Sequence, residues 1–153
     1  MGALAALLAR LKGQRVYIDA NFFIYFLNQK APYFEIVTPI IQAADRGELQ
    51  AICGDAVVSE VMVHPYKAQS PSEIARVKSF FSREEFVTVV RHGQETFDLV
   101  AQLRATSNMR MLDALHYASA VNAGCRYLLT NDKDFKTSGI IEVIGVSSLL
   151  EKR

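Results

Sequence analysis

The sequence predicts an α/β fold, in which a mostly parallel sheet of about five strands has helices on both faces. Strand-like and helix-like segments alternate along the chain, a pattern typical of βαβ units. The candidate strands are short and nearly all apolar, as expected for strands buried on both faces. Neither a repeat nor a linker interrupts this alternation, so we expect one domain over residues 1–153.

The first element is a helix that precedes the first strand. Residues 3–12 are strong helix formers with leucines along one face, and Gly13 provides a stop. An apolar strand over residues 16–18 follows and ends at Asp19. The next helix, residues 20–29, is so rich in aromatic residues that we expect it in the core or at a subunit contact.

A helix over residues 32–46 starts near a proline and is closed by Gly47. The second strand covers residues 49–53. Asp55 then stands where a capping residue belongs, at the start of a helix over residues 56–67. This segment therefore predicts one complete helix–strand–helix unit.

The middle of the chain carries the clearest helix-start signal. Ser70 and Glu73 form a capping box with a proline between them, which predicts a helix over residues 71–82. A third strand over residues 86–90 and a helix over residues 95–105 follow.

The last part begins with a helix over residues 112–123, and Gly124 stands where a left-handed C-terminal residue belongs. We expect the fourth strand at residues 126–130 and the last at residues 140–146. Residues 147–153 read as a polar tail.

Composition limits the function classes. The net charge of +1 excludes nucleic-acid binding that is driven by the overall charge of the protein. A polyanion must therefore be bound by a local basic patch or through a metal. No apolar run approaches the ~18 residues that span a membrane, and we expect a cytoplasmic protein. Cys53 and Cys125 lie in apolar strands, which favours buried free thiols in a reducing compartment.

Four carboxylates are predicted to meet at one edge of the sheet. Asp19 and Asp132 follow the first and fourth strands, whereas Glu60 and Asp113 lie in early turns of helices among apolar neighbours. In an open parallel sheet, the carboxyl ends of the strands form the edge where ligands bind. All four acids would share that edge.

Such a cluster needs compensation, because two charges ~4 Å apart repel by about 4 kcal/mol at an effective dielectric near 20. A set of oxygen ligands suits Mg²⁺ or Mn²⁺, the metals that assist hydrolysis of phosphodiesters. Taken singly, an acid at a strand end or helix start is usually a cap or turn residue. A non-catalytic scaffold with capping acids is therefore the competing hypothesis.

Four ordered motifs resemble the PIN-domain ribonucleases, most closely the VapC-like toxins of toxin–antitoxin pairs. These motifs are Tyr-Ile-Asp19-Ala-Asn21, Val-Val-Ser-Glu60-Val, Leu-Asp113-Ala-Leu-His116-Tyr-Ala-Ser-Ala and Leu-Leu-Thr130-Asn-Asp132-Lys-Asp134-Phe. The resemblance covers about residues 15–146 and implies a three-layer α/β/α sandwich. It departs from the family pattern in the extra helix before the first acid.

The resemblance also implies roles for individual residues. The expected ligands of Mg²⁺ or Mn²⁺, and the catalytic acids, are Asp19, Glu60, Asp113 and Asp132, with Asp134 as a weaker candidate. Asn21 and Thr130 match polar positions that help to hold substrate, water or the carboxylates. Arg110 and Lys133 are candidates for substrate contact because they flank the same edge, with ordinary solvated charges as the alternative. For His116 we expect a structural role, which could include orientation of a carboxylate, and catalysis is the alternative.

The resulting functional hypothesis is a metal-dependent endoribonuclease that acts as the toxin of a type II toxin–antitoxin system. The resemblance implies an RNA substrate, a homodimer and a small antitoxin that inhibits the active site. A nuclease of the same fold in RNA processing or DNA cleavage is the second hypothesis, and the non-catalytic scaffold is the third.

Overall fold

The computed structural model describes residues 2–83, 87–132 and 139–151. Five strands form an all-parallel sheet in the order β3-β2-β1-β4-β5. In chain order the strands are β1 (Arg15–Ile18), β2 (Gln50–Gly54), β3 (Val87–Val90), β4 (Tyr127–Thr130) and β5 (Glu142–Gly145). The prediction of an α/β fold on a sheet of about five strands is confirmed.

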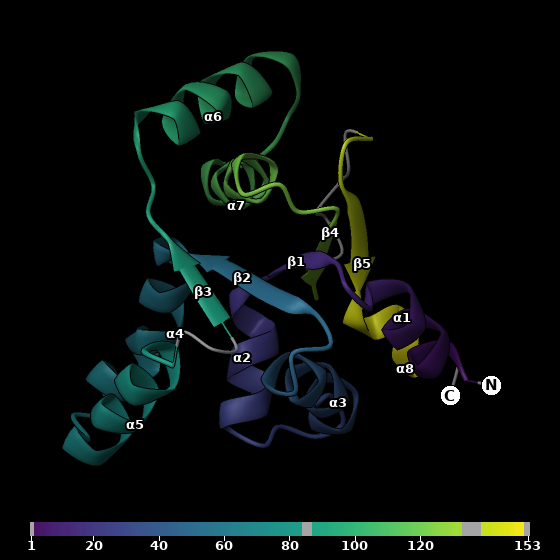
Figure 1. The fold of residues 1–153 in the computed structure, drawn as a ribbon. Helices are drawn as coiled ribbons and strands as arrows, with labels where there is room; N and C mark the ends of the chain where they lie inside the picture. The colour runs from purple at the N-terminus through teal and green to yellow at the C-terminus, as the bar shows by residue number, and fades with distance from the viewer. Residues whose placement is uncertain (1, 84–86, 133–138, 152–153) are drawn as a thin grey trace.

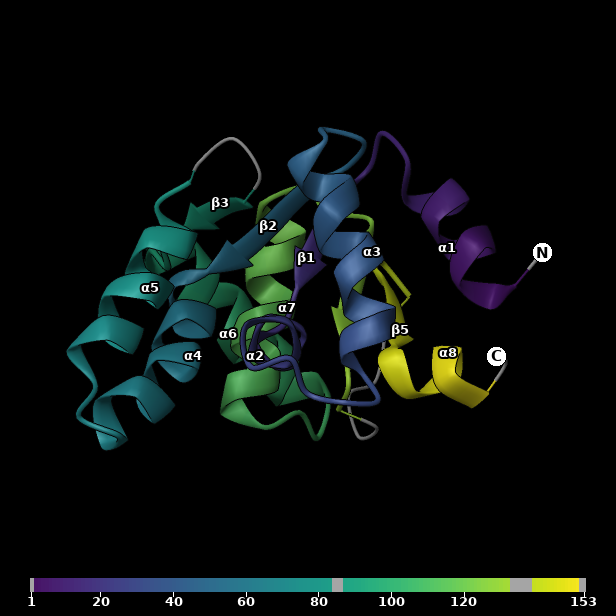
Figure 2. The same cartoon turned by 90° about the horizontal axis from the view of Figure 1, so that it is seen from below.

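Helices cover both faces of this sheet. They are α1 (Ala3–Leu11), α2 (Ala20–Leu27), α3 (Phe34–Asp45), α4 (Asp55–Lys67), α5 (Pro71–Phe81), α6 (Gln94–Thr106), α7 (Met111–Asn122) and α8 (Val146–Glu151). Figure 1 shows α7 against one face with α6 stacked outside it, and α2 to α5 on the other face. The view from below places α1 and α8 together beside the β5 edge (Figure 2).

The core is built around the central strand. Val16, Tyr17 and Ile18 of β1 are fully buried, as are Leu128 and Leu129 of the neighbouring strand β4. Both faces of these strands are covered by helices, which explains why the two segments are apolar without alternation. A smaller apolar cluster, which includes Val100 and Leu115, joins α6 to α7.

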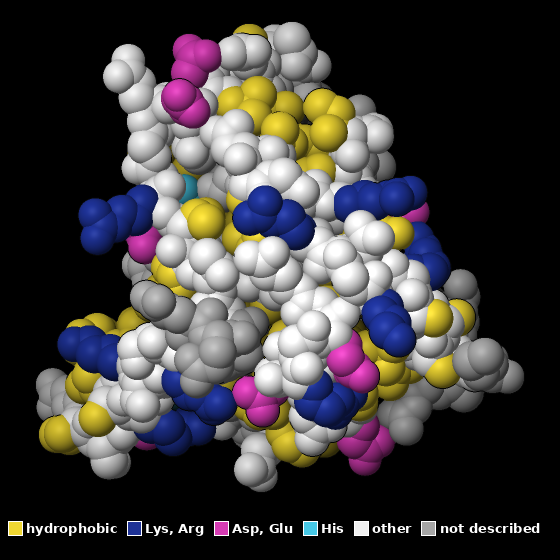
Figure 3. Space-filling model, in the orientation of Figure 1, with side chains coloured by type: hydrophobic (Ala, Val, Ile, Leu, Met, Phe, Trp, Pro, Cys, Tyr) yellow, Lys and Arg dark blue, Asp and Glu magenta, His cyan; other side chains and the backbone are white. Residues whose placement is uncertain are grey.

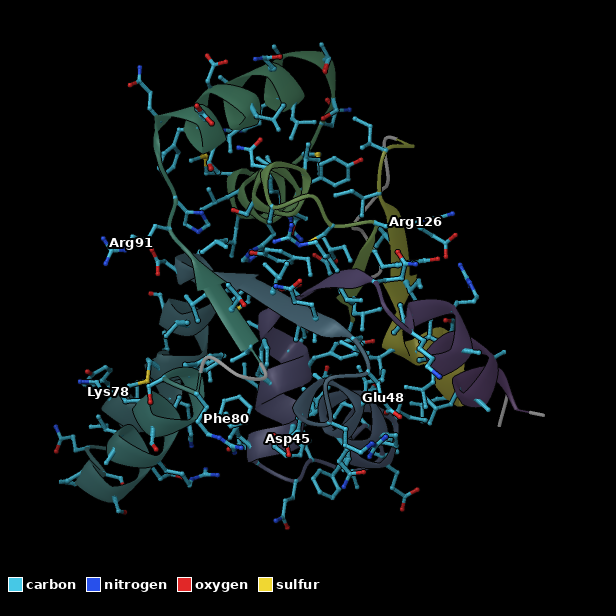
Figure 4. All side chains as sticks on the ribbon, viewed as in Figure 1. Asp45, Glu48, Lys78, Phe80, Arg91 and Arg126 are labelled. Atoms are coloured by element: carbon cyan, nitrogen blue, oxygen red, sulfur yellow. The ribbon has the colours of Figure 1, made fainter. Side chains whose placement is uncertain are left out.

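Aromatic side chains connect the helices of the other face. Phe23 of α2 makes edge-to-face contacts with Phe80 and Phe81 of α5, at ring-centroid distances of 5.9 and 5.0 Å. Figure 4 shows Phe80 pointing from α5 into the space beside α2. The aromatic helix predicted at residues 20–29 thus belongs to the core, where Phe22 and Phe23 are fully buried.

The starts of α5 and α4 test two predictions of helix caps, of which one is confirmed and one is wrong. The capping box is present, because the Ser70 Oγ accepts a hydrogen bond from the backbone N–H of Glu73. The predicted cap at Asp55 is wrong: Gly54 is the N-cap of α4, and Asp55 is the first helical residue. The imidazole of His92 takes over the capping role, since its Nε2 accepts a hydrogen bond from the Ala56 N–H at 3.1 Å.

The end of the chain differs from the prediction. The last strand starts at Glu142 instead of residue 140, and the expected polar tail contains α8. Val146 and Leu149 of this six-residue helix are buried in the core. Packing of this apolar face stabilises a helix too short to form by itself.

The cysteines and the charged surface residues are arranged as the composition predicted. Cys53 and Cys125 are both free and buried, as predicted. On the face in Figure 3, Lys and Arg side chains are spread out, with Asp and Glu beside several of them, so this face carries no continuous basic patch. Within the described part of the chain, no helix has the length and hydrophobicity that a membrane crossing requires.

Candidate active site

The order of the strands brings the first two predicted acids together. Ile18 of β1 lies opposite Leu129 of β4, so the segments that follow these strands leave the sheet side by side. Asp19 begins one segment and Asp132 lies in the other. Strand order reverses between β1 and β4, and such a switch point is where open α/β sheets form a crevice.

The carboxylate of Asp19 is fixed at both oxygens. Its Oδ1 accepts a hydrogen bond from the Ala20 N–H at the start of α2, and its Oδ2 accepts one from the Thr130 hydroxyl, both at 2.7 Å. Asp19 is 7% exposed and Thr130 is fully buried. Two donors in a buried setting hold the carboxylate in one orientation.

Helices from opposite faces of the sheet supply the other two acids. Glu60 comes from the second turn of α4 and Asp113 from the first turn of α7. Together with Asp19 and Asp132 they line one hollow of about 340 Å³, which also contains Asn21, Arg110 and His116. The structure therefore brings all four predicted carboxylates into one pocket, which we call the acid pocket.

One half of the acid pocket is formed by Asp19, Glu60 and His116. The His116 Nε2 donates a hydrogen bond to Glu60 Oε1 at 2.7 Å and lies 3.5 Å from Asp19 Oδ1. One possible ligand atom from each of the three residues lies within 4.8 Å of the other two. His116 thus orients a carboxylate, a structural role that the sequence left open.

A buried tyrosine holds the other side of this imidazole. His116 Nδ1 and the Tyr17 hydroxyl share a hydrogen bond of 2.9 Å, and the hydroxyl also accepts one from the Gly54 N–H at 3.1 Å. Tyr17 is fully buried, and burial raises the pKa of its hydroxyl well above the ordinary value, so it stays protonated. The orientation of Glu60 therefore depends on a chain of contacts that reaches into the sheet.

The other half of the acid pocket is held together by an arginine. The guanidinium of Arg110 donates to Asp113 Oδ2 from Nε at 3.1 Å and to Asp132 Oδ2 from Nη2 at 2.5 Å. Arg110 was a candidate for substrate contact, and the structure places it on two of the acids.

Burial and neighbouring charges shift the pKa values of two residues in the acid pocket. Burial raises the pKa of Asp113, Arg110 opposes this, and the charges of Asp132 and Asp19 raise it further. Burial by itself lowers the pKa of His116, but the hydrogen bond to Glu60 and the surrounding carboxylates more than offset it, so the net pKa is raised.

The remaining predicted residues have different positions. Asn21 lines the acid pocket, and its Oδ1 accepts a hydrogen bond from the Asn131 N–H at 3.3 Å. Thr130 is buried against Asp19, which fits holding a carboxylate better than touching a substrate. Lys133 and Asp134 lie outside the described residues.

Some supporting residues were missed from the sequence. The spacing of His92 in the sequence indicates no partner for it, but besides capping α4 it contacts Ser119 Oγ through Nδ1 at 2.8 Å. Because Nε2 accepts a hydrogen bond, Nδ1 carries the proton, and burial lowers the pKa of this imidazole. Ser119 lies three residues after His116, so helical spacing was the available signal.

The donor set fits a hard divalent cation. Four carboxylates and one imidazole line the acid pocket, and no thiol does. Of these, Asp19, Glu60 and His116 are the residues whose possible ligand atoms lie within 4.8 Å of one another, whereas Asp113 and Asp132 are not in that group. Such a set suits Mg²⁺ or Mn²⁺. A larger hollow of about 1010 Å³ between α6 and α7 contains none of the four predicted acids.

Comparison with known proteins adds a family and a fold. The family model for the PIN domain matches residues 16–139. No curated protein sequence matches the chain. Structural relatives include VapBC2 from Rickettsia felis bound to a promoter DNA fragment, at a TM-score of 0.67 and 14% identity, with 86% of this chain and 98% of that chain covered.

Two further relatives have comparable scores. A toxin–antitoxin complex from Klebsiella pneumoniae matches at a TM-score of 0.64 and 19% identity, covering 86% of this chain and 97% of that one. Mycobacterium tuberculosis VapC20, a sarcin-ricin loop cleaving toxin, matches at 0.65 and 13% identity, covering 84% and 98%. At these identities the structural matches establish the fold alone, whereas the family model spans most of the chain. The chain therefore belongs to the PIN-domain family.

Proposed function

We propose that this protein is an endoribonuclease that uses Mg²⁺ or Mn²⁺ to hydrolyse RNA phosphodiester bonds, as the toxin of a type II toxin–antitoxin pair. The observation that carries the proposal is the acid pocket. Its four carboxylates come from the end of β1, α4, α7 and the end of β4, and they converge on one hollow. Capping acids of a non-catalytic scaffold have no reason to converge in this way.

Each acid has a defined support. Two hydrogen bonds fix Asp19, His116 fixes Glu60, and Arg110 bridges Asp113 and Asp132. These four carboxylates would hold the divalent cation. When bound, the cation supplies a Lewis acid beside the scissile phosphate and neutralises charge in the transition state. Asn21 lines the same hollow and is available for the substrate.

The toxin assignment is supported by the structural relatives. Matched structures are described as toxin–antitoxin or VapBC complexes, and one relative is described as a sarcin-ricin loop cleaving toxin. By extension, we propose a small antitoxin as the inhibitory partner and a homodimer as the assembly. Expression in cells without the antitoxin should arrest growth, and transcript-end mapping should then show cleaved RNA.

The biochemical test uses a panel of RNAs and DNAs of the same sequences. We expect RNA cleavage with Mg²⁺ or Mn²⁺, none with EDTA, and products with 5′-phosphate and 3′-hydroxyl ends. Asp19→Asn and Asp113→Asn should each lower the rate by at least about a hundredfold, because each removes a proposed ligand. Asp45→Asn is the matched control, since Asp45 is exposed and pairs with Arg83 away from the acid pocket.

Each result decides between the hypotheses. Equal activity in all samples and all variants would refute a metal-dependent nuclease. Cleavage of DNA in preference to RNA would assign the acid pocket to the DNA-cleaving hypothesis. Growth without arrest, together with specific cleavage of one RNA in vitro, would favour a role in RNA processing.

A further inference from the structure

Arg110 bridges two of the four carboxylates that line the acid pocket. Its Nη2 lies 3.0 Å from Asp113 Oδ2 and 2.5 Å from Asp132 Oδ2, and its Nε also donates to Asp113 Oδ2. The two carboxylates belong to different elements, α7 and the segment that follows β4. One guanidinium therefore offsets part of the repulsion between these two acids.

The position of Arg110 in the chain explains this contact. Arg110 is the N-cap residue of α7, and Asp113 follows one turn later on the same helix. The end of β4 lies next to the start of α7, which places Asp132 within reach of the same side chain.

A divalent cation and this guanidinium compete for the same atoms. Arg110 holds Oδ2 of both acids, so a cation coordinated through these two atoms would have to take its place. Two positive groups at such close range would also repel each other strongly. A cation that binds through either Oδ2 therefore requires Arg110 to leave that acid.

Arg110 can leave its partners in a way that His116 cannot. The His116 side chain is 2% exposed and is fixed between Glu60 and Tyr17. The Arg110 side chain is 66% exposed, while the acids it contacts are 14% and 23% exposed. A solvated guanidinium on a flexible stem can move outward at little cost.

We infer that Arg110 is an exchangeable counter-ion: it holds Asp113 and Asp132 while the cation is absent, and it binds a backbone phosphate of the RNA after the cation has displaced it. This inference rests on the proposed function. Arginine suits both states, because its planar fork of donors matches carboxylate and phosphate geometry. The mouth of the acid pocket would then present a positive group to the substrate only after the cation has bound.

The test compares Arg110→Gln with Arg104→Gln. Arg104 is exposed on α6, contacts Met111 Sδ, and has no ion pair among the described residues, so both variants remove one exposed positive charge. Calorimetric titration of the metal-free protein with Mn²⁺ should show about three- to tenfold tighter binding for Arg110→Gln than for wild type. Arg104→Gln should match wild type, and Arg110→Lys should lie between the two.

Two further measurements test each state of Arg110. Without metal, Arg110→Gln should have a lower Tm than Arg104→Gln, and saturating Mn²⁺ should close this gap. In RNA cleavage, Arg110→Gln should raise KM about tenfold with a smaller change in kcat, because a phosphate contact is lost.

The outcomes separate this inference from the proposed function. Mn²⁺ binding that is equal or weaker in Arg110→Gln, with wild-type binding intact, would overturn the counter-ion inference and leave the nuclease proposal standing. An unchanged KM would overturn the phosphate contact. Failure of wild type and all variants to bind Mn²⁺ or to cleave RNA would overturn the proposed function itself.

Discussion

At the scale of single residues, the carboxylates in the two halves of the acid pocket have different kinds of partner. His116 and the buried donors around Asp19 form one half that is fixed within the core. Arg110 bridges the other half from the solvent side. The buried half, formed by Asp19, Glu60 and His116, can hold a ligand in one position. The exposed half, formed by Asp113 and Asp132, can exchange Arg110 for another partner.

Substitution of Tyr17 tests whether the buried half of the acid pocket depends on the contact between Tyr17 and His116. Tyr17→Phe removes the hydroxyl that binds His116 and accepts from the Gly54 N–H, which leaves a buried donor without its partner. We expect a loss of about 1–3 kcal/mol in the free energy of unfolding. We also expect a lower kcat for RNA cleavage with KM unchanged, because Glu60 loses its alignment.

Tyr117→Phe is the matched control for this prediction. Tyr117 is also fully buried, and its hydroxyl accepts a hydrogen bond from the Ile141 N–H, which does not line the acid pocket. Denaturant unfolding and steady-state cleavage should show a similar loss of stability in the two variants but a lower kcat only in Tyr17→Phe. An equal fall in kcat would mean that the Tyr17 hydroxyl acts only through stability.

At the scale of elements, α7 organises the chemistry. Arg110, Asp113, His116 and Ser119 follow one another at three-residue spacing along this helix. The sequence signalled Asp113 through its apolar neighbours and His116 through its spacing. It could not signal their partners, because Glu60, Tyr17 and His92 come from other elements whose positions depend on the tertiary fold.

The start of α4 shows one such tertiary contact. A Cβ added at Gly54 would lie 2.4 Å from Cε1 and 2.9 Å from Nε2 of His92. Gly54→Ala should therefore destabilise the protein by about 2 kcal/mol or more, because the ring is held in place by Ala56 and Ser119. In a His92→Ala background the same change should cost less, because the remaining close contact is the Tyr17 hydroxyl at 3.0 Å, and denaturant unfolding of the four proteins measures this coupling.

Gly93→Ala is the control for this double-mutant cycle. Gly54 and Gly93 are both N-cap residues, of α4 and α6, so the intrinsic effect of alanine at a cap is the same. A Cβ at Gly93 meets nothing within 4 Å. Equal costs for the two glycine substitutions, or additive costs in the cycle, would show that His92 does not set the requirement for glycine at position 54.

At the scale of the whole molecule, the sequence predicted the layers of the fold better than the local boundaries of its elements. Alternating apolar strands and amphipathic helices require a parallel sheet, whatever the strand order. That order brought the end of β1 beside the end of β4 and let α4 and α7 reach the same edge from opposite faces. The missed elements were the cap of α4 and the helix α8, which both depend on packing by distant residues.

The stability of the metal-free protein should depend on pH through two histidines of opposite behaviour. The folded-state pKa of His116 is raised from its ordinary 6.5, so its stabilising contribution is complete below about pH 6.5 and is lost as the pH rises through the folded value. The folded-state pKa of His92 is lowered from the same value, so its contribution is present above about pH 6.5 and is lost as the pH falls.

These opposite signs predict a maximum in stability near pH 6.5, measured as Tm between about pH 5 and 8 in EDTA. His116→Gln should flatten the alkaline side of this profile, and His92→Gln should flatten the acid side, whatever each variant does to the absolute Tm. His64→Gln, at an exposed position of α4, should leave both sides unchanged. A profile that keeps both slopes in all three variants would show that these imidazoles do not set the pH dependence.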